Sequence, residues 1–311
     1  MTKPDAASHT PSSARGASGA AVTHAFSVDV EDWFHILESD AAPDIAAWSK
    51  LESRVERSTG VLLDLLDDHG HKATFFVLGW VAERFPDLLA ELSHRGHEVG
   101  SHSHHHGLVS QAGPDAFARD LARSLEAITR ATGTDVTCFR APGFSIGHDE
   151  TWAFEILADH GITLDSSLFL ADRAHGGFQL NRLRPFEIVL HDGRRMLEAP
   201  VVPLRLPRLS LPWTGGGYLR LLPQAALLQL FAHAERCERP VVTYVHPREV
   251  DPGQPRMRLP MARRFKYYVG LETVVDKLQA LFARHRFASV GEVAHGGVKD
   301  PPLFLSRHRA A

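Results

Sequence analysis

The sequence predicts an α/β fold in which parallel strands alternate with helices, either as a barrel or as a sheet. Short apolar stretches typical of buried strands alternate with amphipathic stretches typical of helices from about residue 24 to residue 165. Polar residues follow the carboxyl end of each predicted strand, which is where such folds carry their chemistry. A length of 311 residues is enough for one barrel-sized domain or two smaller ones.

The predicted elements follow one another in a regular order. Strands are expected at residues 24–30, 73–78, 98–101, 136–139, 162–164, 241–245 and 287–290. Helices are expected at residues 53–69, 80–95, 114–132, 150–160, 223–237 and 271–284, several of them ended by glycine. The alternation stops between residues 170 and 223, a segment rich in Arg, Pro and Gly. We predict that this segment is a β-rich insertion with long loops that caps the cleft.

Composition limits the function and the setting of the chain. The formal net charge is −3, so no electrostatic attraction to nucleic acid is expected. Residues 1–22 contain no apolar run typical of a signal peptide and are predicted to be a disordered leader, and residues 296–311 are predicted to be a flexible tail. No run of about 18 apolar residues predicts a membrane span. We therefore expect a cytoplasmic protein, with a place at the inner face of the membrane as an alternative.

A cluster of histidines follows the predicted strand at residues 98–101. His102 and His106 are four residues apart, so a helical turn after Ser101 would direct both side chains to the same face. Two imidazoles can hold a divalent metal if a third ligand arrives from elsewhere. The acidic segment 29–32, at the end of the first strand, is the candidate donor. The alternative is that the histidines simply occupy a solvated loop.

Other strand ends add groups that suit metal-assisted hydrolysis. Asp29, Arg140, Asp165 and His246 each lie at or just after the end of a predicted strand. A metal lowers the pKa of a water molecule, a carboxylate can take the proton of that water as it attacks a carbonyl, and a histidine can protonate the leaving nitrogen. This combination predicts hydrolysis of an amide or ester.

The ordered motifs resemble those of the NodB-type polysaccharide deacetylases, which form carbohydrate esterase family 4. The matching segments are residues 28–33, 74–76, 96–106, 139–142, 165–167 and 244–247, so the resemblance covers nearly the whole chain after residue 22. The segments around residues 215–218 and 263–268 resemble the C-terminal extension of the branch linked to exopolysaccharide gene clusters with exosortase systems. The resemblance implies a distorted (β/α) barrel at residues 23–295, with an extension at about 247–295. It also implies removal of acetyl groups from N-acetylated sugar units.

The resemblance also implies a role for each motif residue. Asp29 would be the general base, His246 the general acid, and Arg140 would hold the carboxylate of Asp29. His102 and His106 would bind the metal, which we expect to be Zn²⁺, with Co²⁺ or another divalent ion as the alternative. Much of the family has two adjacent aspartates in the first motif, whereas here Asp29 is followed by Val30-Glu31-Asp32. The metal carboxylate is therefore Glu31, which strand alternation favours, or Asp32, which a bend after Val30 would favour.

Further residues are candidates for substrate contact or support. They are Pro142, Asp165, Trp33 and Tyr244. Asp165 could equally be a turn former or a support for His246. The predicted substrate is a glycan with N-acetylhexosamine units. Two alternatives are an amidohydrolase of the same fold that acts on small acylated or cyclic amides, and an inactive relative that only binds glycans.

Overall fold

A computed structural model describes residues 22–37, 42–171, 175–206 and 209–305. The predicted leader falls almost entirely outside these residues. One large sheet forms the centre of the molecule, and its parallel strands in sequence order are β1 (Thr23–Val30), β2 (Thr74–Val77), β3 (Glu98–Ser101), β4 (Cys138–Phe139), β5 (Leu164–Asp165), β10 (Val242–Val245) and β11 (Arg286–Ala288). The predicted α/β class is thus confirmed.

The strand order shows how the barrel is distorted. It runs β10-β1-β2-β3-β4-β5-β7-β6-β12, where β12 is Leu303–Phe304, with β11 beside the start of β1. Among the described residues no pairing joins β10 to β12, so hydrogen bonding does not close the sheet into a ring. The only antiparallel neighbours that the described residues place in this sheet are β6 (Phe186–Val189) and β7 (Arg195–Glu198). Strands β1–β5, β7, β10 and β11 run in one direction, so their carboxyl ends meet on one edge, whereas β6 and β12 run the opposite way.

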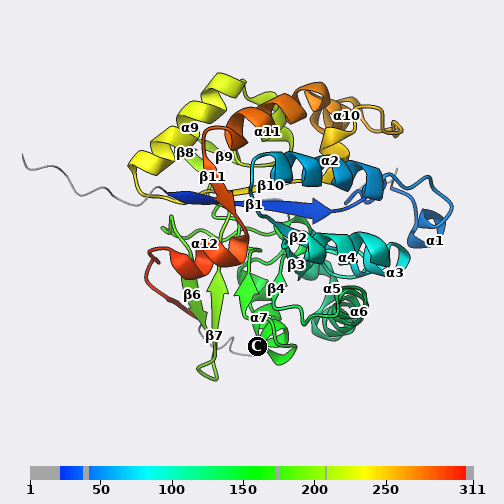
Figure 1. Ribbon diagram of the computed structural model, residues 1–311. Coiled ribbons are helices and arrows are strands. Elements are labelled where there is room, and N and C mark those ends of the chain that lie inside the picture. The colour runs from blue at the N-terminus through cyan, green and yellow to red at the C-terminus, as the bar shows by residue number, and fades with distance from the viewer. Residues whose placement is uncertain (1–21, 38–41, 172–174, 207–208, 306–311) are drawn as a thin grey trace, which may run out of the picture.

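Helices cover the sheet on both sides of β1 (Figure 1). The longer ones are α2 (Val55–Asp68), α4 (Pro86–His94), α6 (Pro114–Thr132), α7 (Trp152–Asp159), α9 (Gln224–Arg236) and α11 (Val274–Phe282). Helix α10 (Met261–Tyr268) is as long as α7, and the shorter ones are α1 (Ile45–Trp48), α3 (Gly79–Arg84), α5 (Val109–Ala112), α8 (Gly216–Leu221) and α12 (Val290–Gly296). No described helix is long and apolar enough to cross a bilayer.

One predicted helix is broken in two. Residues 80–95 were expected to form a single helix, but α3 ends at Arg84 and α4 begins at Pro86. Phe85 between them has φ −130° and ψ 58°, outside the helical region. The reason is Pro86, because proline disfavours helical geometry in the residue before it and starts a new helix well.

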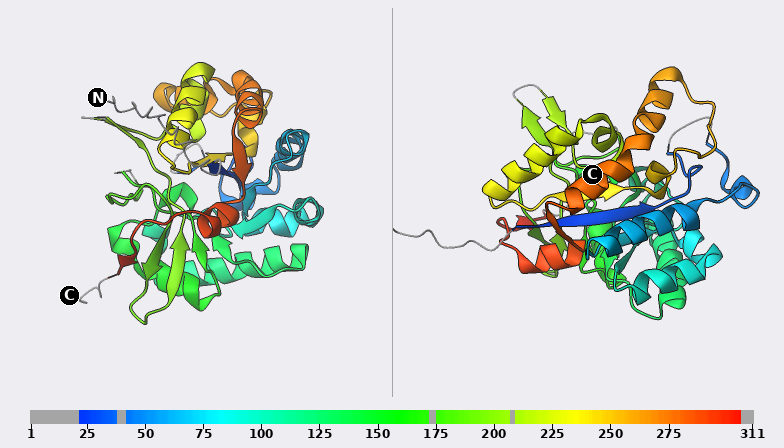
Figure 2. Two further views of the ribbon diagram at one scale, coloured as in Figure 1. Left: turned by 60° about the vertical axis from the view of Figure 1, so that its left-hand side comes forward. Right: turned by 45° about the horizontal axis from the view of Figure 1, so that its top comes forward.

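The segment at residues 170–223, predicted to be a β-rich insertion, belongs in part to the main sheet. Its first half supplies β6 and β7, which extend the main sheet beyond β5. Only its second half stands apart, as the hairpin of β8 (Leu204–Leu206) and β9 (Leu209–Leu211) followed by α8. The right-hand view of Figure 2 shows this yellow-green hairpin away from the sheet.

The segment predicted to be a flexible tail, residues 296–311, contains a short strand in its described part. Residues Leu303–Phe304 form β12, which pairs in parallel with β6 at Ile188 and Val189. A two-residue strand has too little sequence pattern to be predicted, and only the neighbouring β6 makes it a strand. The remainder, from residue 306 onward, lies outside the described residues.

Side-chain alternation along β1 divides the core and prepares the site. Phe26, Val28 and Val30 pack into the larger apolar cluster beneath the helices. Ser27 and Asp29 therefore point to the opposite face, the inside of the curved sheet. Both are buried, so the polar groups on this inner face need partners from neighbouring strands.

Candidate active site

The first strand delivers two carboxylates to the inside of the barrel. Strand β1 ends at Val30, and the amide of Glu31 donates back to the carbonyl of Asp29 at 2.9 Å. This tight turn keeps both Asp29 and Glu31 on the inner side, although the strand does not persist as far as Glu31. Both side chains are almost completely buried.

His102 and His106 converge, but without the helical turn that the spacing suggested. Ser103 and His106 have φ values of 65° and 58°, the left-handed region, and the segment after β3 is an irregular loop. Ser103 Oγ accepts the amide of His106 at 3.2 Å and holds the turn. The two imidazole centroids lie 5.3 Å apart. A tight loop thus brings the rings together in place of a helix.

Glu31 lies directly against both imidazoles. Its Oε1 is 2.8 Å from His106 Nε2 and 3.2 Å from His102 Nε2. His102 Nδ1 lies 2.7 Å from the carbonyl oxygen of Arg140, which can only accept, so Nδ1 carries the hydrogen. The lone pair of His102 Nε2 is therefore free to face a metal. Two imidazoles and one carboxylate with ligand atoms within 4.8 Å of one another fit a divalent ion such as Zn²⁺.

Asp32 points away from this cluster. Its carboxylate accepts hydrogen bonds from Ser53 Oγ, from the amide of Arg54 at 3.0 Å and from the amide of Trp33 at 2.9 Å. These contacts fix the start of α2 against the end of β1. Of the two carboxylates that the sequence left open, the structure brings only Glu31 to the histidines.

Arg140 connects the base candidate to the rest of the sheet. Its Nη1 donates to Asp29 Oδ1 at 2.8 Å and to Ser27 Oγ at 2.7 Å. Its other donors reach the Ser166 carbonyl at 3.1 Å and Ser166 Oγ at 2.8 Å. The guanidinium is fully buried and lies 4.2 Å from the ring centroid of Phe76. Four directed hydrogen bonds fix the position of this charge and, through it, of Asp29.

Asp165 forms a turn and does not contact His246. Its two oxygens accept from the amide of Ser167 at 2.9 Å and from Ser167 Oγ at 2.6 Å, and Ser167 Oγ in turn accepts the amide of Ala141. Burial raises the pKa of Asp165, and burial together with the neighbouring Asp165 raises the pKa of Glu198 well above its usual range. The pair supports the loop that carries Ser166, and hence Arg140.

The partner of His246 is Glu249, which the sequence interpretation missed. His246 Nδ1 donates to Glu249 Oε1 at 3.0 Å, and Arg220 Nε lies 3.9 Å from the same oxygen. Pro247 starts a short 3₁₀ turn (η3, Pro247–Val250) that folds Glu249 back under the imidazole. The sequence signal that could have identified Glu249 is its place three residues after His246, which is followed directly by Pro247. With Nδ1 occupied, Nε2 faces Asp29 Oδ2 at 4.0 Å and Glu31 Oε1 at 3.7 Å.

The charges around the cluster shift two pKa values in opposite directions. Burial alone would raise the pKa of Glu31, but His106, His246 and His102 lower it well below the usual range. Burial alone would lower the pKa of His246, whereas Glu31 and Glu249 raise it. The geometry therefore favours a carboxylate at Glu31 and a protonated imidazole at His246.

These groups lie at the bottom of a pocket of about 1070 Å³. Asp29, Glu31, both metal-facing histidines, Tyr244 and His246 all line it. Trp33 does not: its Nε1 donates to the Glu52 carbonyl, and the ring borders a smaller hollow with Asp32. Pro142 is buried beside the pocket-lining Gly143 and Phe144. The structure thus brings Tyr244 to the site but places Trp33 and Pro142 outside the lining.

Two family models match consecutive parts of the chain. Residues 44–164 match the family described as "Polysaccharide deacetylase", and residues 166–295 match a domain of unknown function, DUF3473. The chain contains a polysaccharide deacetylase domain with a C-terminal DUF3473 extension. The boundary divides the site, because His102, His106 and Arg140 belong to the deacetylase segment while His246 and Glu249 belong to the extension.

Individual relatives match part of the chain. The chain is 32% identical over 98 residues to "Peptidoglycan-N-acetylglucosamine deacetylase" of Bacillus cereus, covering 31% of this chain and 36% of that protein. It is 37% identical over 73 residues to "Chitooligosaccharide deacetylase" of Rhizobium leguminosarum bv. trifolii, covering 24% of this chain and 34% of that one. The chain therefore spans about a third of the length of these curated relatives.

A solved structure shares the overall fold of this chain. The putative polysaccharide deacetylase of Mycobacterium smegmatis superposes with a TM-score of 0.56 at 19% identity. The match covers 99% of this chain and 100% of the other. The fold predicted from the sequence is thereby confirmed, including the region of the extension.

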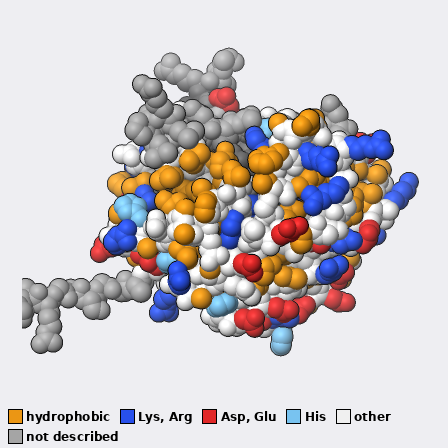
Figure 3. Space-filling model, turned by 90° about the horizontal axis from the view of Figure 1, so that it is seen from above, with side chains coloured by type: hydrophobic (Ala, Val, Ile, Leu, Met, Phe, Trp, Pro, Cys, Tyr) orange, Lys and Arg blue, Asp and Glu red, His pale blue; other side chains and the backbone are white. Residues whose placement is uncertain are grey.

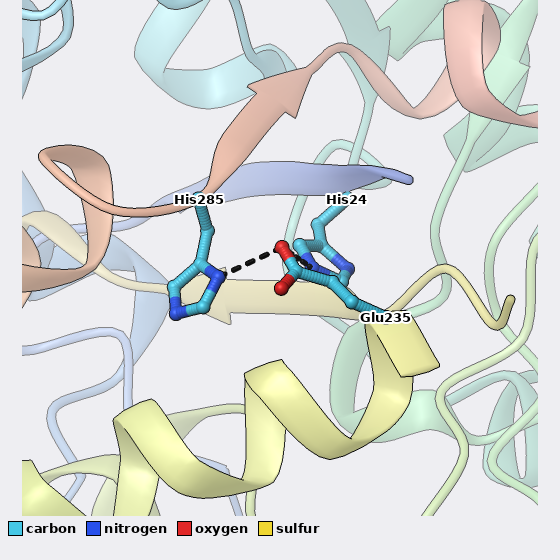
Figure 4. A group of neighbouring side chains, drawn as sticks. All are labelled: His24, Glu235 and His285. Atoms are coloured by element: carbon cyan, nitrogen blue, oxygen red, sulfur yellow. Dashed lines mark hydrogen bonds and ion pairs between the residues drawn. The ribbon is translucent and has the colours of Figure 1, made fainter. Parts of the chain in front are cut away.

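A second group of possible ligands lies at the opposite end of β1. His24 of β1, Glu235 of α9 and His285, which follows α11, approach one another (Figure 4), with Glu235 Oε1 2.8 Å from His285 Nδ1 and 3.5 Å from His24 Nε2. The amide of Val241 donates to His24 Nδ1 at 3.2 Å, so in the neutral ring Nε2 carries the hydrogen. That tautomer has no lone pair for a metal at Nε2. We interpret this group as a polar cluster in which Glu235 accepts a hydrogen bond from His285 and lies 3.5 Å from His24 Nε2.

The His24 cluster predicts a loss of stability in acid. Burial is the main cause that lowers the pKa of His24 from a usual 6.5 to about 4; Glu235 opposes the shift and His285 adds to it. Between pH 6.5 and 4 the unfolded chain binds this proton and the folded chain does not, so the free energy of unfolding falls as the pH falls through that window. The expected contribution of His24 to this slope is about 1.4 kcal/mol per pH unit.

The variant His24→Asn, whose side chain can still accept from the Val241 amide, should flatten the pH dependence of urea unfolding by this amount. The same change at the exposed His94 should not; equal slopes for wild type and His24→Asn would contradict the assignment.

Proposed function

We propose that this chain is a metal-dependent hydrolase that removes acetyl groups from N-acetylhexosamine units of a glycan. One observation carries the proposal: Glu31, His102 and His106 form a cluster that could hold a metal, and Asp29 and His246 lie beside it. All five groups face the same pocket. The donor set favours Zn²⁺, with Co²⁺ as the alternative. A divalent ion bound there would supply Lewis acidity and lower the pKa of a water molecule.

Asp29 acts as the general base in this proposal. Arg140 occupies Oδ1, which leaves Oδ2 directed toward the pocket and toward His246 Nε2 at 4.0 Å. Oδ2 takes a proton from the attacking water as the water adds to the acetyl carbonyl carbon. The buried guanidinium of Arg140 balances the charge of the carboxylate, so Asp29 can accept this proton as an anion.

His246 acts as the general acid. When the tetrahedral intermediate collapses, the carbon–nitrogen bond breaks and the leaving amine needs a proton, which His246 Nε2–H donates. Glu249 holds the opposite ring nitrogen at 3.0 Å and so fixes both the tautomer and the direction of Nε2. The products are acetate and a sugar with a free amino group.

The substrate class rests on the family and on the two relatives named above. Both relatives are named as deacetylases of N-acetylated glycans, and the open pocket has room for more than one sugar ring. A nascent exopolysaccharide handled in the cytoplasm or at the inner face of the membrane is the substrate that we propose. Phe144, Phe169 and Tyr244 give the pocket apolar walls, although each ring is almost completely buried.

Acetate release from an N-acetylglucosamine oligomer tests this function. Purified protein is stripped with a chelator and then given Zn²⁺ or Co²⁺, and acetate is measured with the metal-free protein as the control. We expect metal to restore release. Stoichiometric metal binding without acetate release from any N-acetylated oligomer would contradict the glycan assignment. Hydrolysis of a small acylated amide by the same protein would then favour the amidohydrolase alternative. Neither metal binding nor release would favour a glycan-binding relative.

A further inference from the structure

Several large apolar side chains are exposed at one rim of the pocket. Met261 and Phe265 of α10 are 89% and 59% exposed, and Leu221 at the end of α8 is 52% exposed. All three line the pocket mouth, together with the partly exposed Tyr218. We call these four residues the apolar rim. Met261 and Phe265 are four residues apart on one helix, so they share a face.

The segment that carries Met261 and Phe265, half of the apolar rim, is also strongly basic. Residues 252–270 contain Arg256, Arg258, Arg263, Arg264 and Lys266 and no acidic residue. Arg258, Arg264 and Lys266 are exposed, and within the described part of the chain none of the three forms an ion pair with a carboxylate. Seen from above in Figure 3, basic side chains gather with hydrophobic ones between them at the right-hand end, where Figure 1 places α10.

Helix α10 lies on the surface, yet its position is fixed. None of its residues is fully buried. Arg220 of α8 donates to the carbonyls of Tyr267 at 2.7 Å, Lys266 at 2.8 Å and Val269 at 3.1 Å. This buried guanidinium holds the carboxyl end of α10 against α8. The apolar rim therefore has a fixed position beside the pocket wall. An amphipathic helix with apolar residues on one face and cations around them is typical of proteins that lie in a bilayer interface.

We propose that the apolar rim and the basic residues of segment 252–270 form a docking surface for an anionic lipid bilayer. Met261, Phe265 and Leu221 enter the boundary between headgroups and acyl chains, and Arg258, Arg264 and Lys266 attract the negative headgroups. The pocket then opens at the membrane surface. A glycan held on a lipid carrier would reach the cluster without leaving the bilayer; that consequence rests on the proposed function, but the docking itself does not.

Vesicle sedimentation tests the docking surface without any turnover. The full chain is mixed with vesicles of phosphatidylcholine alone or with an equal share of phosphatidylglycerol, at low and high salt. We expect binding to the anionic vesicles, weakened by at least about tenfold on neutral vesicles or at high salt. Met261→Asp with Phe265→Asp should abolish binding. A triple variant should weaken vesicle binding as much as removing the anionic lipid does; its changes are Arg258→Gln, Arg264→Gln and Lys266→Gln.

A matched control separates this surface from general stickiness. Val298 and Phe304 are 74% and 68% exposed and follow α12 in the chain, and Phe304 belongs to β12, at the opposite end of the strand order from β10. Val298→Asp with Phe304→Asp should leave vesicle binding unchanged, and circular dichroism and metal content should show that every variant is folded. Wild-type protein that stays in solution with anionic vesicles would overturn the proposal, as would equal loss in the control. One further result would also overturn the proposal: wild-type protein that forms a dimer and does not bind vesicles, and that becomes a monomer when Met261→Asp and Phe265→Asp are introduced. That result would assign the apolar rim to contact with a second copy of the chain.

Discussion

Glu31→Gln should lose its metal, whereas Asp32→Asn should keep it. The neutral amide of the substituted side chain is a poor replacement for the anionic ligand of Glu31, which lies 2.8 Å and 3.2 Å from the two imidazoles. Loss of a residue that only hydrogen-bonds to a metal ligand typically lowers metal affinity about 10- to 100-fold. Loss of the carboxylate ligand itself should therefore lower the Zn²⁺ affinity by more than about 100-fold. Competition with a chromophoric chelator measures this affinity.

Asp32→Asn is the matched control because the two acids are adjacent in sequence and similarly buried. Its carboxylate faces Ser53 and the amide of Arg54, so the variant should unfold at a lower temperature but bind metal at wild-type stoichiometry. His106→Ala should behave like Glu31→Gln. A metal that remains in Glu31→Gln and leaves in Asp32→Asn would show that the carboxylates have been assigned the wrong way round.

Asp29→Asn should retain metal and lose most of its turnover. The asparagine oxygen can still accept from Arg140 Nη1, but the side chain can no longer take a proton from water. Removal of a general base typically lowers kcat by about 10²–10⁴-fold, and we expect a loss of that order in acetate release with little change in Zn²⁺ affinity.

The stability of Asp29→Asn distinguishes a catalytic effect from a structural one. Breaking a buried ion pair typically costs about 3–5 kcal/mol, because one charge stays buried and unpaired. The retained acceptor at position 29 should keep the loss below that range, as urea unfolding would show. Wild-type turnover in a folded, metal-loaded Asp29→Asn would remove Asp29 from the base role.

The fold could be predicted because its local signals are strong. Helix α6 begins with a proline and ends before Gly133, and the structure has it at the predicted bounds, Pro114–Thr132. Elements that depend on distant partners were not predictable in the same way. β12 is two residues long, and β6 and β7 extend the main sheet only because β5 offers a free edge to β7.

The site was predictable by residue type but not in its local geometry. The left-handed backbone of Ser103 and His106 gives no sequence signal, since neither is glycine. The choice between Glu31 and Asp32 depends on a turn that the alternation rule does not describe. Glu249 was missed because its role appears only once η3 folds it under His246.

The pairing of β1 determines when the catalytic groups can assemble during synthesis. β1 pairs with β2 nearby but also with β10, as Ser27 Oγ donates to the carbonyl of Thr243, 216 residues later. A chain growing from the ribosome can therefore gather Asp29, Glu31 and the two histidines early, but it cannot complete that sheet or acquire His246 until the extension has emerged. Loop closure over such a distance is slow and entropically costly. The DUF3473 extension is thus no detachable appendage: a product truncated before it would expose the edge of β1 and lack the proposed proton donor.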